Sequence, residues 1–348
     1  MAMKIAVYTI ACNEEKHVER WAASNVDADV RLIADTGSTD STVELAKKNN
    51  VTVIPVNVRP FRFDVARNTA LSLLPADVDV CVIQDMDEIL EPGFIQTIRD
   101  NWSEETHRGW IKLNTGVDWD SDRVHARNGY RWVFPCHERC VKYDGQETSV
   151  VLNARMLHRP DNSKSRGQYL GLLEMMTRED PSNPRGWFYL GREYFYKNMK
   201  QETVSALTQY VSMSKYPSEC SAAYRMLATV DEDNAESHVI QAIVCDERRE
   251  SLAQAALLFY RKEDWVKCYK YAKRAVDASS PSDHFQETWA TDGLVFDLIA
   301  ISAYRLGKYE EALLFGDKAW KASPDDERLL TNMKYYQEKV DGNIQSHD

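Results

Sequence analysis

Short apolar segments alternate with helical segments over about the first 115 residues, and this alternation constrains the fold of the 348-residue chain more than any other feature. Near-continuous apolar strands separated by helices are typical of a parallel sheet that is covered on both faces. We therefore predict an N-terminal α/β domain with a Rossmann-like, mostly parallel sheet. The predicted strands span residues 4–12, 30–35, 51–56 and 78–87, and the predicted helices span 14–25, 38–50 and 63–75.

Three clusters of polar residues follow the predicted strands, at Ala11 to Glu14, Asp35 to Asp40 and Asp85 to Glu88. The carboxyl ends of parallel strands meet at one edge of the sheet, where ligands of such sheets bind. The shared position of the clusters is a stronger signal than any one of them, and it predicts a ligand site at this edge.

Asp85 and Asp87 directly follow an apolar strand. Because side chains alternate along a strand, both carboxylates are expected on the same side. Paired carboxylates suit a hard divalent cation, Mg²⁺ or Mn²⁺, that keeps open positions for phosphate oxygens. The alternative is a solvated turn that caps the next helix. The position at the end of a buried strand, beside two other polar clusters, favours the metal site.

Residues 116–168 lack clean periodic runs and are rich in aromatic residues, charges and histidines. This composition is typical of active-site loops, and also of ordinary irregular connections. We predict mainly loops here.

From Pro184 onward the chain is helical and repetitive. Residues 187–194 match the W-x2-L-G-x2-Y opening of a tetratricopeptide repeat, and residues 307–324 match the second helix and exit turn of another. A weaker copy spans 265–281, and residues 217–248 indicate a divergent hairpin. We predict four helical hairpins, with a non-repetitive helical bundle as the alternative.

These patterns divide the chain into an α/β domain over residues 1–175, an all-α tetratricopeptide-like domain over 176–340, and a flexible tail over 341–348. No stretch approaches the ~18 apolar residues of a membrane span. The seven cysteines are odd in number and scattered, which indicates reduced thiols in a cytoplasmic protein. The formal net charge of −11 disfavours non-specific attraction to polyphosphate.

Four motifs in order, TIACNEE, ADTGSTDST, FDVARNTAL and VIQDMDE, resemble the GT-A fold of family 2 glycosyltransferases. The likeness is greatest to bacterial and phage members that carry tetratricopeptide repeats after the catalytic domain, a group that includes bacteriocin peptide glycosyltransferases. It extends into HERCV, MLHRPDNSKSR and PRGWFYLGREY. The resemblance implies a cytoplasmic enzyme of a bacterial cell or phage-infected host.

The resemblance implies that Thr9, Ala11 and Glu14 line the nucleotide pocket. It also implies that Asp35 accepts hydrogen bonds from the base, which is most often uracil in this family. Many members have a second acidic residue where this chain has Thr36. For Asp35 and Asp40 the alternative is capping of the helix that begins near Ser41, which we favour for Asp40 only.

In the same way, Arg67 is expected to face the phosphates or sugar of the donor, with a surface arginine as the alternative. Asp85 and Asp87 would hold the sugar and the metal–diphosphate unit, with Asp87 as the direct ligand. The resemblance makes His158 a further metal ligand, against a structural histidine. Lys164 and Arg166 would clamp the diphosphate, or else lie in a solvated loop.

Glu138 is our candidate for the catalytic base, with His137 orienting it, because inversion requires a base opposite the leaving diphosphate. Asp118 and Asp120 compete for this role. Cys136, His137 and Cys140 also suggest a zinc site, but no fourth ligand appears at a suitable spacing.

The sequence thus predicts a metal-dependent, inverting glycosyltransferase that moves a sugar from a nucleoside-diphosphate donor, most often a UDP-sugar, to a hydroxyl or thiol. One alternative is a non-catalytic tetratricopeptide scaffold with an inert GT-A-like domain. Another is a nucleotidyltransferase, but the glycine-rich loop of that class is missing after the first strand. A peptide, protein, glycan or modified DNA acceptor stays open, as does self-association through the helical repeats.

Overall fold

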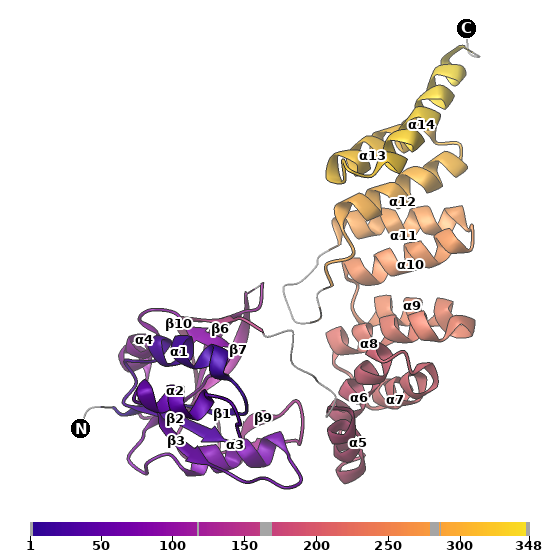
Figure 1. Cartoon of the computed structure of the whole chain (residues 1–348). Helices are drawn as coiled ribbons and strands as arrows, with labels where there is room; N and C mark the ends of the chain where they lie inside the picture. The colour runs from indigo at the N-terminus through magenta and orange to yellow at the C-terminus, as the bar shows by residue number, and fades with distance from the viewer. Residues whose placement is uncertain (1–2, 117, 161–168, 279–284, 286, 346–348) are drawn as a thin grey trace. The chain divides into compact units, whose positions relative to one another are not determined.

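The computed structural model describes residues 3–116, 118–160, 169–278, 285 and 287–345. The chain divides into two compact units, Met1–Glu179 and Asp180–Asp348 (Figure 1). Among the described residues, no helix is long and apolar enough to cross a membrane.

The first unit is built on a sheet with the strand order β3-β2-β1-β4-β7-β6-β10-β5. Parallel pairs join the first four of these strands and also β6 to β10, whereas β7 and β5 pair antiparallel with their neighbours. A separate hairpin joins β8 and β9. The strands are β1 (Ile5–Ala11), β2 (Val30–Asp35), β3 (Thr52–Pro55), β4 (Val80–Ile83), β5 (Glu88–Leu90), β6 (Arg108–Asn114), β7 (Asp118–Ala126), β8 (Tyr130–Val133), β9 (Arg139–Lys142) and β10 (Ser149–His158).

Both faces of this sheet are covered. The alternating side chains of β1 show why: Val7 packs into a core with Trp21, while Tyr8 packs into a second core with Leu71 and Trp132. This two-sided burial explains the near-continuous apolar sequence of the central strands and confirms the predicted α/β class. The helices of the unit are α1 (Glu15–Ser24), α2 (Thr42–Lys48), α3 (Phe63–Ser72), α4 (Phe94–Asn101) and α5 (Tyr169–Glu179).

The prediction of mainly loops over residues 116–168 is wrong. Strands β7 to β10 lie in this range, and β7 pairs with both β4 and β6. Residues 118–120 of β7 are exposed or half-buried, and burial becomes continuous only near Val124 and His125. Trp119 is the only apolar residue among the first six of this strand, so β7 lacks the apolar run that marks a central strand.

The second unit consists of helical hairpins in which consecutive helices pack against each other. The four predicted hairpins are confirmed as α6/α7, α8/α9, α10/α11 and α12/α13. A further helix, α14, follows them and reaches Gln345, within the range that was assigned to a tail. The bounds are α6 (Pro184–Tyr196), α7 (Lys200–Met213), α8 (Pro217–Val230), α9 (Ala235–Cys245), α10 (Arg249–Arg261), α11 (Trp265–Asp277), α12 (Asp292–Arg305), α13 (Tyr309–Ala322) and α14 (Glu327–Gln345).

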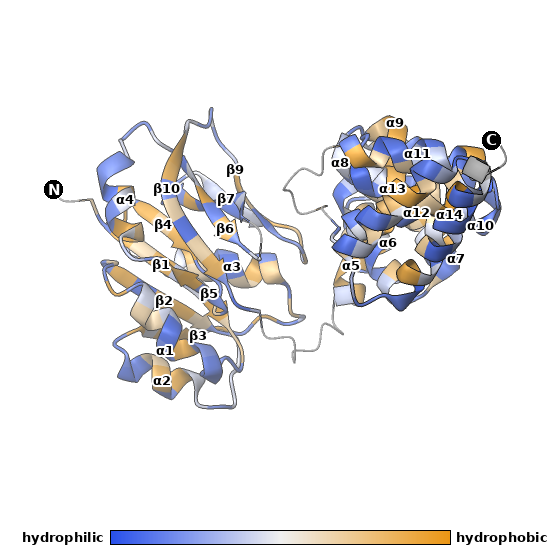
Figure 2. Ribbon diagram, turned by 90° about the horizontal axis from the view of Figure 1, so that it is seen from above, coloured by the Kyte–Doolittle hydropathy of each residue, from blue (hydrophilic) through white to orange (hydrophobic). Residues whose placement is uncertain are grey.

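Small residues of the repeat motif lie where helices approach closely. A Cβ atom at Gly191 would collide with the side chain of Leu207, so α6 and α7 can pack this tightly only around glycine. In α13, Ala312 and Ala319 are fully buried. Apolar (orange) and polar (blue) segments alternate along the helices of this unit (Figure 2). The motif is therefore a packing signature, as expected for stacked hairpins.

Candidate active site

A cavity of about 620 Å³ opens at the carboxyl ends of β1 and β4. The segments after these strands line it, as the shared position of the polar clusters predicted. Arg67 reaches it from α3, His158 from the end of β10, and Glu138 from the connection between β8 and β9. Segments far apart in the sequence thus converge on one cavity.

Asp87 and His158 form a pair at this cavity. His158 Nε2 lies 3.1 Å from Asp87 Oδ2, and this hydrogen bond raises the pKa of His158 above its usual value. The register of β10 against β5 places His158 opposite Glu88, the residue after Asp87. The backbone N–H of Arg159 donates to the Asp87 carbonyl at 2.7 Å, which fixes the two segments together.

The Asp87–His158 pair fits a divalent cation that is bound partly by a ligand. A carboxylate oxygen and an imidazole nitrogen are both metal ligands. The described part of the chain holds no group of three or more His, Cys, Asp or Glu side chains arranged around one point. Mg²⁺ often takes only one or two protein ligands and completes its shell with phosphate oxygens and water.

Arg67 lies between Asp85 and Glu138. Its Nε donates to Glu138 Oε1 at 2.6 Å, and its Nη2 donates to Asp85 Oδ1 at 2.7 Å. The guanidinium also stacks over the ring of Trp132, 4.7 Å from the ring centre. Arg67 is only 7% exposed, so the alternative of a surface arginine is wrong. Burial lowers its pKa, but the two carboxylates outweigh burial and raise it above the ordinary value.

Asp85 lies beside a buried ion pair between Arg123 and Glu88. Arg123 donates to Glu88 Oε1 at 2.5 Å, and its Nη1 lies 3.5 Å from Asp85 Oδ2. Burial raises the pKa of Asp85, yet Arg67 and Arg123 outweigh it and lower that pKa to about 2. Burial also raises the pKa of Glu88, to about 7. Asp85 is therefore a permanent anion.

Both oxygens of Asp85 already lie in ion pairs, one with each arginine. This geometry argues against a metal that is shared by Asp85 and Asp87, because a cation at Asp85 would compete with two guanidinium groups, and it agrees with Asp87 as the direct ligand. It suits Asp85 to orient Arg67 within the cavity. Asp87, which lies in the turn between β4 and β5, is the acidic residue of the motif that pairs with His158.

Glu138 and His137 both line the cavity. His137 has a left-handed backbone with φ of 50°, and its ring stacks on Tyr169 with centroids 6.0 Å apart. The side chain of Glu138 is 12% exposed and faces Arg67. The competing candidates for the base, Asp118 and Asp120, do not line the cavity. Asp118 pairs with Arg155, and Asp120 pairs with Lys112.

Two residues of the predicted nucleotide pocket do not line this cavity. Thr9 is 1% exposed inside β1, and its hydroxyl donates to the carbonyl of Ile10. Asp35 is buried, and its carboxylate accepts from the backbone N–H groups of Gly37 and Ser38. Thr9 lies deep in the strand and Asp35 shapes the loop after β2, and their contacts with the nucleotide stay predictions.

Ala11, Glu14 and Thr36 do line the cavity, beside the end of β1. Asp40 accepts from the backbone N–H of Thr42, the first residue of α2, as our capping interpretation predicted. Lys164 and Arg166 lie outside the described residues.

The zinc interpretation finds no support in the described residues. Cys136 and Cys140 are both buried, and among the described residues no metal-binding group of three or more side chains includes them. Burial raises the pKa of Cys140 to about 12, which disfavours the thiolate form that zinc requires.

Sequence reasoning missed an aromatic wall of the cavity. Phe63 stacks on Tyr169 with centroids 5.8 Å apart and an interplanar angle of 9°, and Phe61 packs edge-on against Phe63. All three line the cavity. Phe61 and Phe63, two aromatic residues just before and at the start of α3, were the sequence signal that could have indicated this wall. Tyr169 comes from α5, more than a hundred residues later, and no local pattern links it to them.

A buried polar chain supports Arg67 from inside the sheet. The indole N–H of Trp132 donates to the Tyr8 hydroxyl at 3.0 Å, and that hydroxyl lies 3.1 Å from His125 Nε2. Because an indole N–H is only a donor, Tyr8 gives its own proton to His125. The other ring nitrogen, Nδ1, then donates to the carbonyl of Ala126 at 2.7 Å. This arrangement requires a neutral imidazole.

We expect acid to destabilise the first unit through His125. Burial lowers the pKa of His125 from the ordinary 6.5 to about 4. The neutral imidazole therefore stabilises the fold fully above pH 6.5, and this contribution is lost as the pH falls from 6.5 toward 4. The loss is on the order of 3 kcal/mol.

Denaturant unfolding of the first unit at a series of pH values measures this effect. His125→Gln should flatten the pH dependence between 6.5 and 4, whereas the matched variant His107→Gln should keep it. An equal slope in wild type and His125→Gln would contradict the assignment.

Comparison with known proteins agrees with this geometry. Residues 6–165 match the family model described as glycosyl transferase family 2. No curated protein matches the chain.

Several solved structures are similar to parts of the chain. Glucosyl-3-phosphoglycerate synthase from Mycobacterium tuberculosis, solved with Mn²⁺, UDP and phosphoglyceric acid, is 26% identical over 33% of this chain and 44% of that chain, with a TM-score of 0.29. A thermophilic TPR protein from Thermus thermophilus is 18% identical over 49% of this chain and 88% of that chain, with a TM-score of 0.31. YrrB, a TPR protein, is 16% identical over 48% of this chain and 82% of that chain, with a TM-score of 0.38.

The family match covers the sheet, the Asp87–His158 pair and the Arg67 network, and the fold around them is the expected α/β fold. Residues 6–165 thus form a glycosyl transferase family 2 domain, and this domain supports a glycosyltransferase activity for the chain.

Proposed function

We propose that the chain transfers a sugar from a nucleoside-diphosphate donor, specifically a UDP-sugar, to an acceptor hydroxyl or thiol with inversion at the anomeric carbon. The observation that carries this proposal is the Asp87–His158 pair beside a buried arginine, at the strand ends of a family 2 domain.

Asp87 and His158 would hold Mn²⁺ or Mg²⁺. Such a cation, when bound, offsets the negative charge of the diphosphate leaving group. Because the hydrogen bond to Asp87 favours the protonated imidazole, His158 has to release a proton before its nitrogen can act as a ligand. Lys164 and Arg166 remain predicted partners of the diphosphate.

Arg67 supplies a fixed positive charge at the cavity. Its Nη1 is buried and has no hydrogen-bond partner among the described residues, whereas Nε and Nη2 are bound. A buried donor without a partner is costly unless a ligand or water satisfies it. We infer that Nη1 donates to a phosphate or sugar oxygen of the donor, and that Asp85 and Glu138 hold the guanidinium in place for this contact.

Glu138 is the proposed base. In the reaction, the acceptor oxygen or sulfur forms a bond to C1 of the sugar, the bond from C1 to the diphosphate oxygen breaks, and Glu138 takes the acceptor proton. General-base assistance of this kind contributes about 10²–10⁴-fold. His137 stacks on Tyr169 and so extends the aromatic wall of the active-site cavity toward Glu138. We propose that the acceptor or the sugar ring packs on this wall.

A panel of nucleoside-diphosphate sugars, assayed for Mn²⁺-dependent hydrolysis by the full chain, tests this function. We expect hydrolysis of a UDP-sugar that stops when EDTA removes the metal. If no donor is hydrolysed and UDP does not bind in the presence of Mn²⁺, the inert scaffold becomes the better interpretation. The same assay with added peptides, proteins or glycans would identify the acceptor class.

A further inference from the structure

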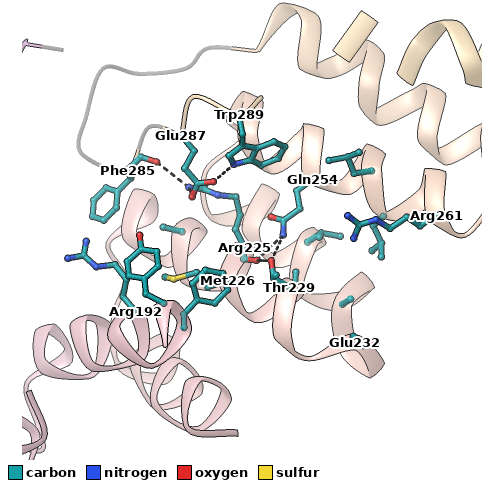
Figure 3. A pocket seen from close by; sticks show the side chains of 18 of the residues that line it. Arg192, Arg225, Met226, Thr229, Glu232, Gln254, Arg261, Phe285, Glu287 and Trp289 are labelled. Atoms are coloured by element: carbon teal, nitrogen blue, oxygen red, sulfur yellow. Dashed lines mark hydrogen bonds and ion pairs between the residues drawn. The ribbon is translucent and has the colours of Figure 1, made fainter. Parts of the chain in front are cut away.

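The helical unit contains its own cavity of about 800 Å³, which is lined entirely by residues of that unit (Figure 3). It lies among α6, α8, α9, α10 and the segment that precedes α12. Its walls are largely apolar and aromatic. They include Phe188, Tyr196, Met226, Leu257 and Trp289, and both Tyr196 and Trp289 are more than a third exposed.

Two arginines that line this cavity, Arg192 and Arg261, pair with neither of its carboxylates, although the charge of Arg192 also acts on Glu219 outside the lining. The two carboxylates of the cavity already have cationic partners, because Glu287 pairs with Arg225 at 3.0 Å and Glu232 pairs with Lys200 at 3.2 Å. Within the part of the chain that the structure describes, Arg192 and Arg261 form no ion pair. Figure 3 shows them on opposite sides of the cavity. A chain with a formal net charge of −11 thus presents a locally basic site.

Between these arginines lie two polar atoms that have no hydrogen-bond partner among the described residues. Arg225 is 3% exposed, and its Nε has no hydrogen-bond acceptor among the described residues. Gln254 donates to the carbonyl of Arg225 at 2.9 Å and to the Thr229 hydroxyl at 3.1 Å, but its Oε1 has no donor within the described part of the chain. Figure 3 shows both side chains in the middle of the cavity.

One unsatisfied donor and one unsatisfied acceptor complement a peptide group, which carries one C=O and one N–H. Buried polar atoms of this kind are normally satisfied, by protein, water or ligand. Arg192 is already held over the ring of Tyr189, 4.6 Å from its centre, so little freedom is lost when it binds an anion.

We propose that this cavity binds an acidic peptide segment. The peptide backbone forms hydrogen bonds with Arg225 and Gln254. An apolar side chain of the peptide packs against the aromatic residues Phe188, Tyr196 and Trp289 of this cavity. The carboxylates of the peptide pair with Arg192 and Arg261. The proposal does not depend on the transfer reaction. A chain with the Asp87→Asn substitution is therefore expected to bind the peptide as the wild type does.

Fluorescence anisotropy with the full chain tests the proposal. The probes are two pools of labelled octapeptides that carry a central leucine flanked by glutamates in one pool and by lysines in the other. We expect the glutamate pool to bind at least about tenfold more tightly, and salt to weaken this binding. In the double variant Arg192→Glu/Arg261→Glu the preference should reverse. The double variant Lys334→Glu/Lys339→Glu makes the same charge change on α14, outside the cavity, and should leave the preference unchanged.

Gln254→Leu provides a second variant that leaves both arginines in place. It removes the unpaired acceptor and should weaken binding of the glutamate pool about tenfold. Equal binding of the two pools, or unchanged binding in the variants, would overturn the proposal. Binding of labelled oligosaccharides in place of either peptide pool would also overturn it and identify a glycan site.

Discussion

Replacing Asp87 with asparagine is expected to lower metal-dependent donor hydrolysis by about 10²–10³-fold, the range seen when one group that stabilises developing charge is removed. Asparagine keeps the size of the side chain but loses the negative charge that a hard cation prefers. His158 also loses the carboxylate that raises its pKa. The measurement is the initial rate of UDP-sugar hydrolysis over a series of Mn²⁺ concentrations.

Asp120→Asn is the matched control for this prediction. Asp120 is an exposed carboxylate of the same sheet that pairs with Lys112 and does not line the cavity. The Asp120→Asn substitution should leave the hydrolysis rate and its dependence on Mn²⁺ unchanged. If Asp120→Asn reduces the rate as strongly as Asp87→Asn, the site has been placed on the wrong carboxylate.

Replacing Arg67 with alanine is expected to destabilise the first unit by about 3–5 kcal/mol, because removal of one partner leaves buried carboxylates without compensation. Asp85 and Glu138 would then face each other across the vacated space, with Arg123 as the remaining cation near Asp85. Turnover should be lost as well. Denaturant unfolding measures the first effect and donor hydrolysis the second.

Arg62→Ala is the control for Arg67, since Arg62 lies just before α3 and pairs with Asp64 and with the half-exposed Glu179. Ion pairs open to solvent contribute about 0–1 kcal/mol, so a small change is expected. Arg67→Lys separates charge from geometry, because lysine keeps the charge but cannot bind two carboxylates in the fixed geometry of a guanidinium. Equal losses in Arg62→Ala and Arg67→Ala would contradict the central position of Arg67.

The sequence predicted the central strands because burial on both faces leaves an unmistakable apolar run, as in residues 80–83 of β4. It also predicted the helical hairpins, since glycine and alanine at close helix contacts have fixed spacing. Strand β7 was missed because Trp119 is the only apolar residue among its first six. Antiparallel strands of this kind carry a weaker pattern than buried parallel ones.

Site residues were predictable where a polar side chain follows a buried strand closely in sequence, as Asp87 follows β4. They were not predictable where only tertiary contacts bring a residue to the cavity. Arg123 lies in β7 and reaches Asp85 only through strand pairing, and Tyr169 reaches the cavity from a distant helix. The role of Asp85 was also not predictable, because its two oxygens pair with Arg67 and Arg123, which are remote from it in sequence.

Diffraction from crystals soaked with Mn²⁺ and UDP tests the central claim most directly, because manganese is located by its anomalous signal. The account predicts an anomalous peak within bonding distance of an Asp87 carboxylate oxygen and His158 Nε2, with diphosphate oxygens completing the shell. Bound UDP with no peak at this pair, or with the peak at another place, would contradict it.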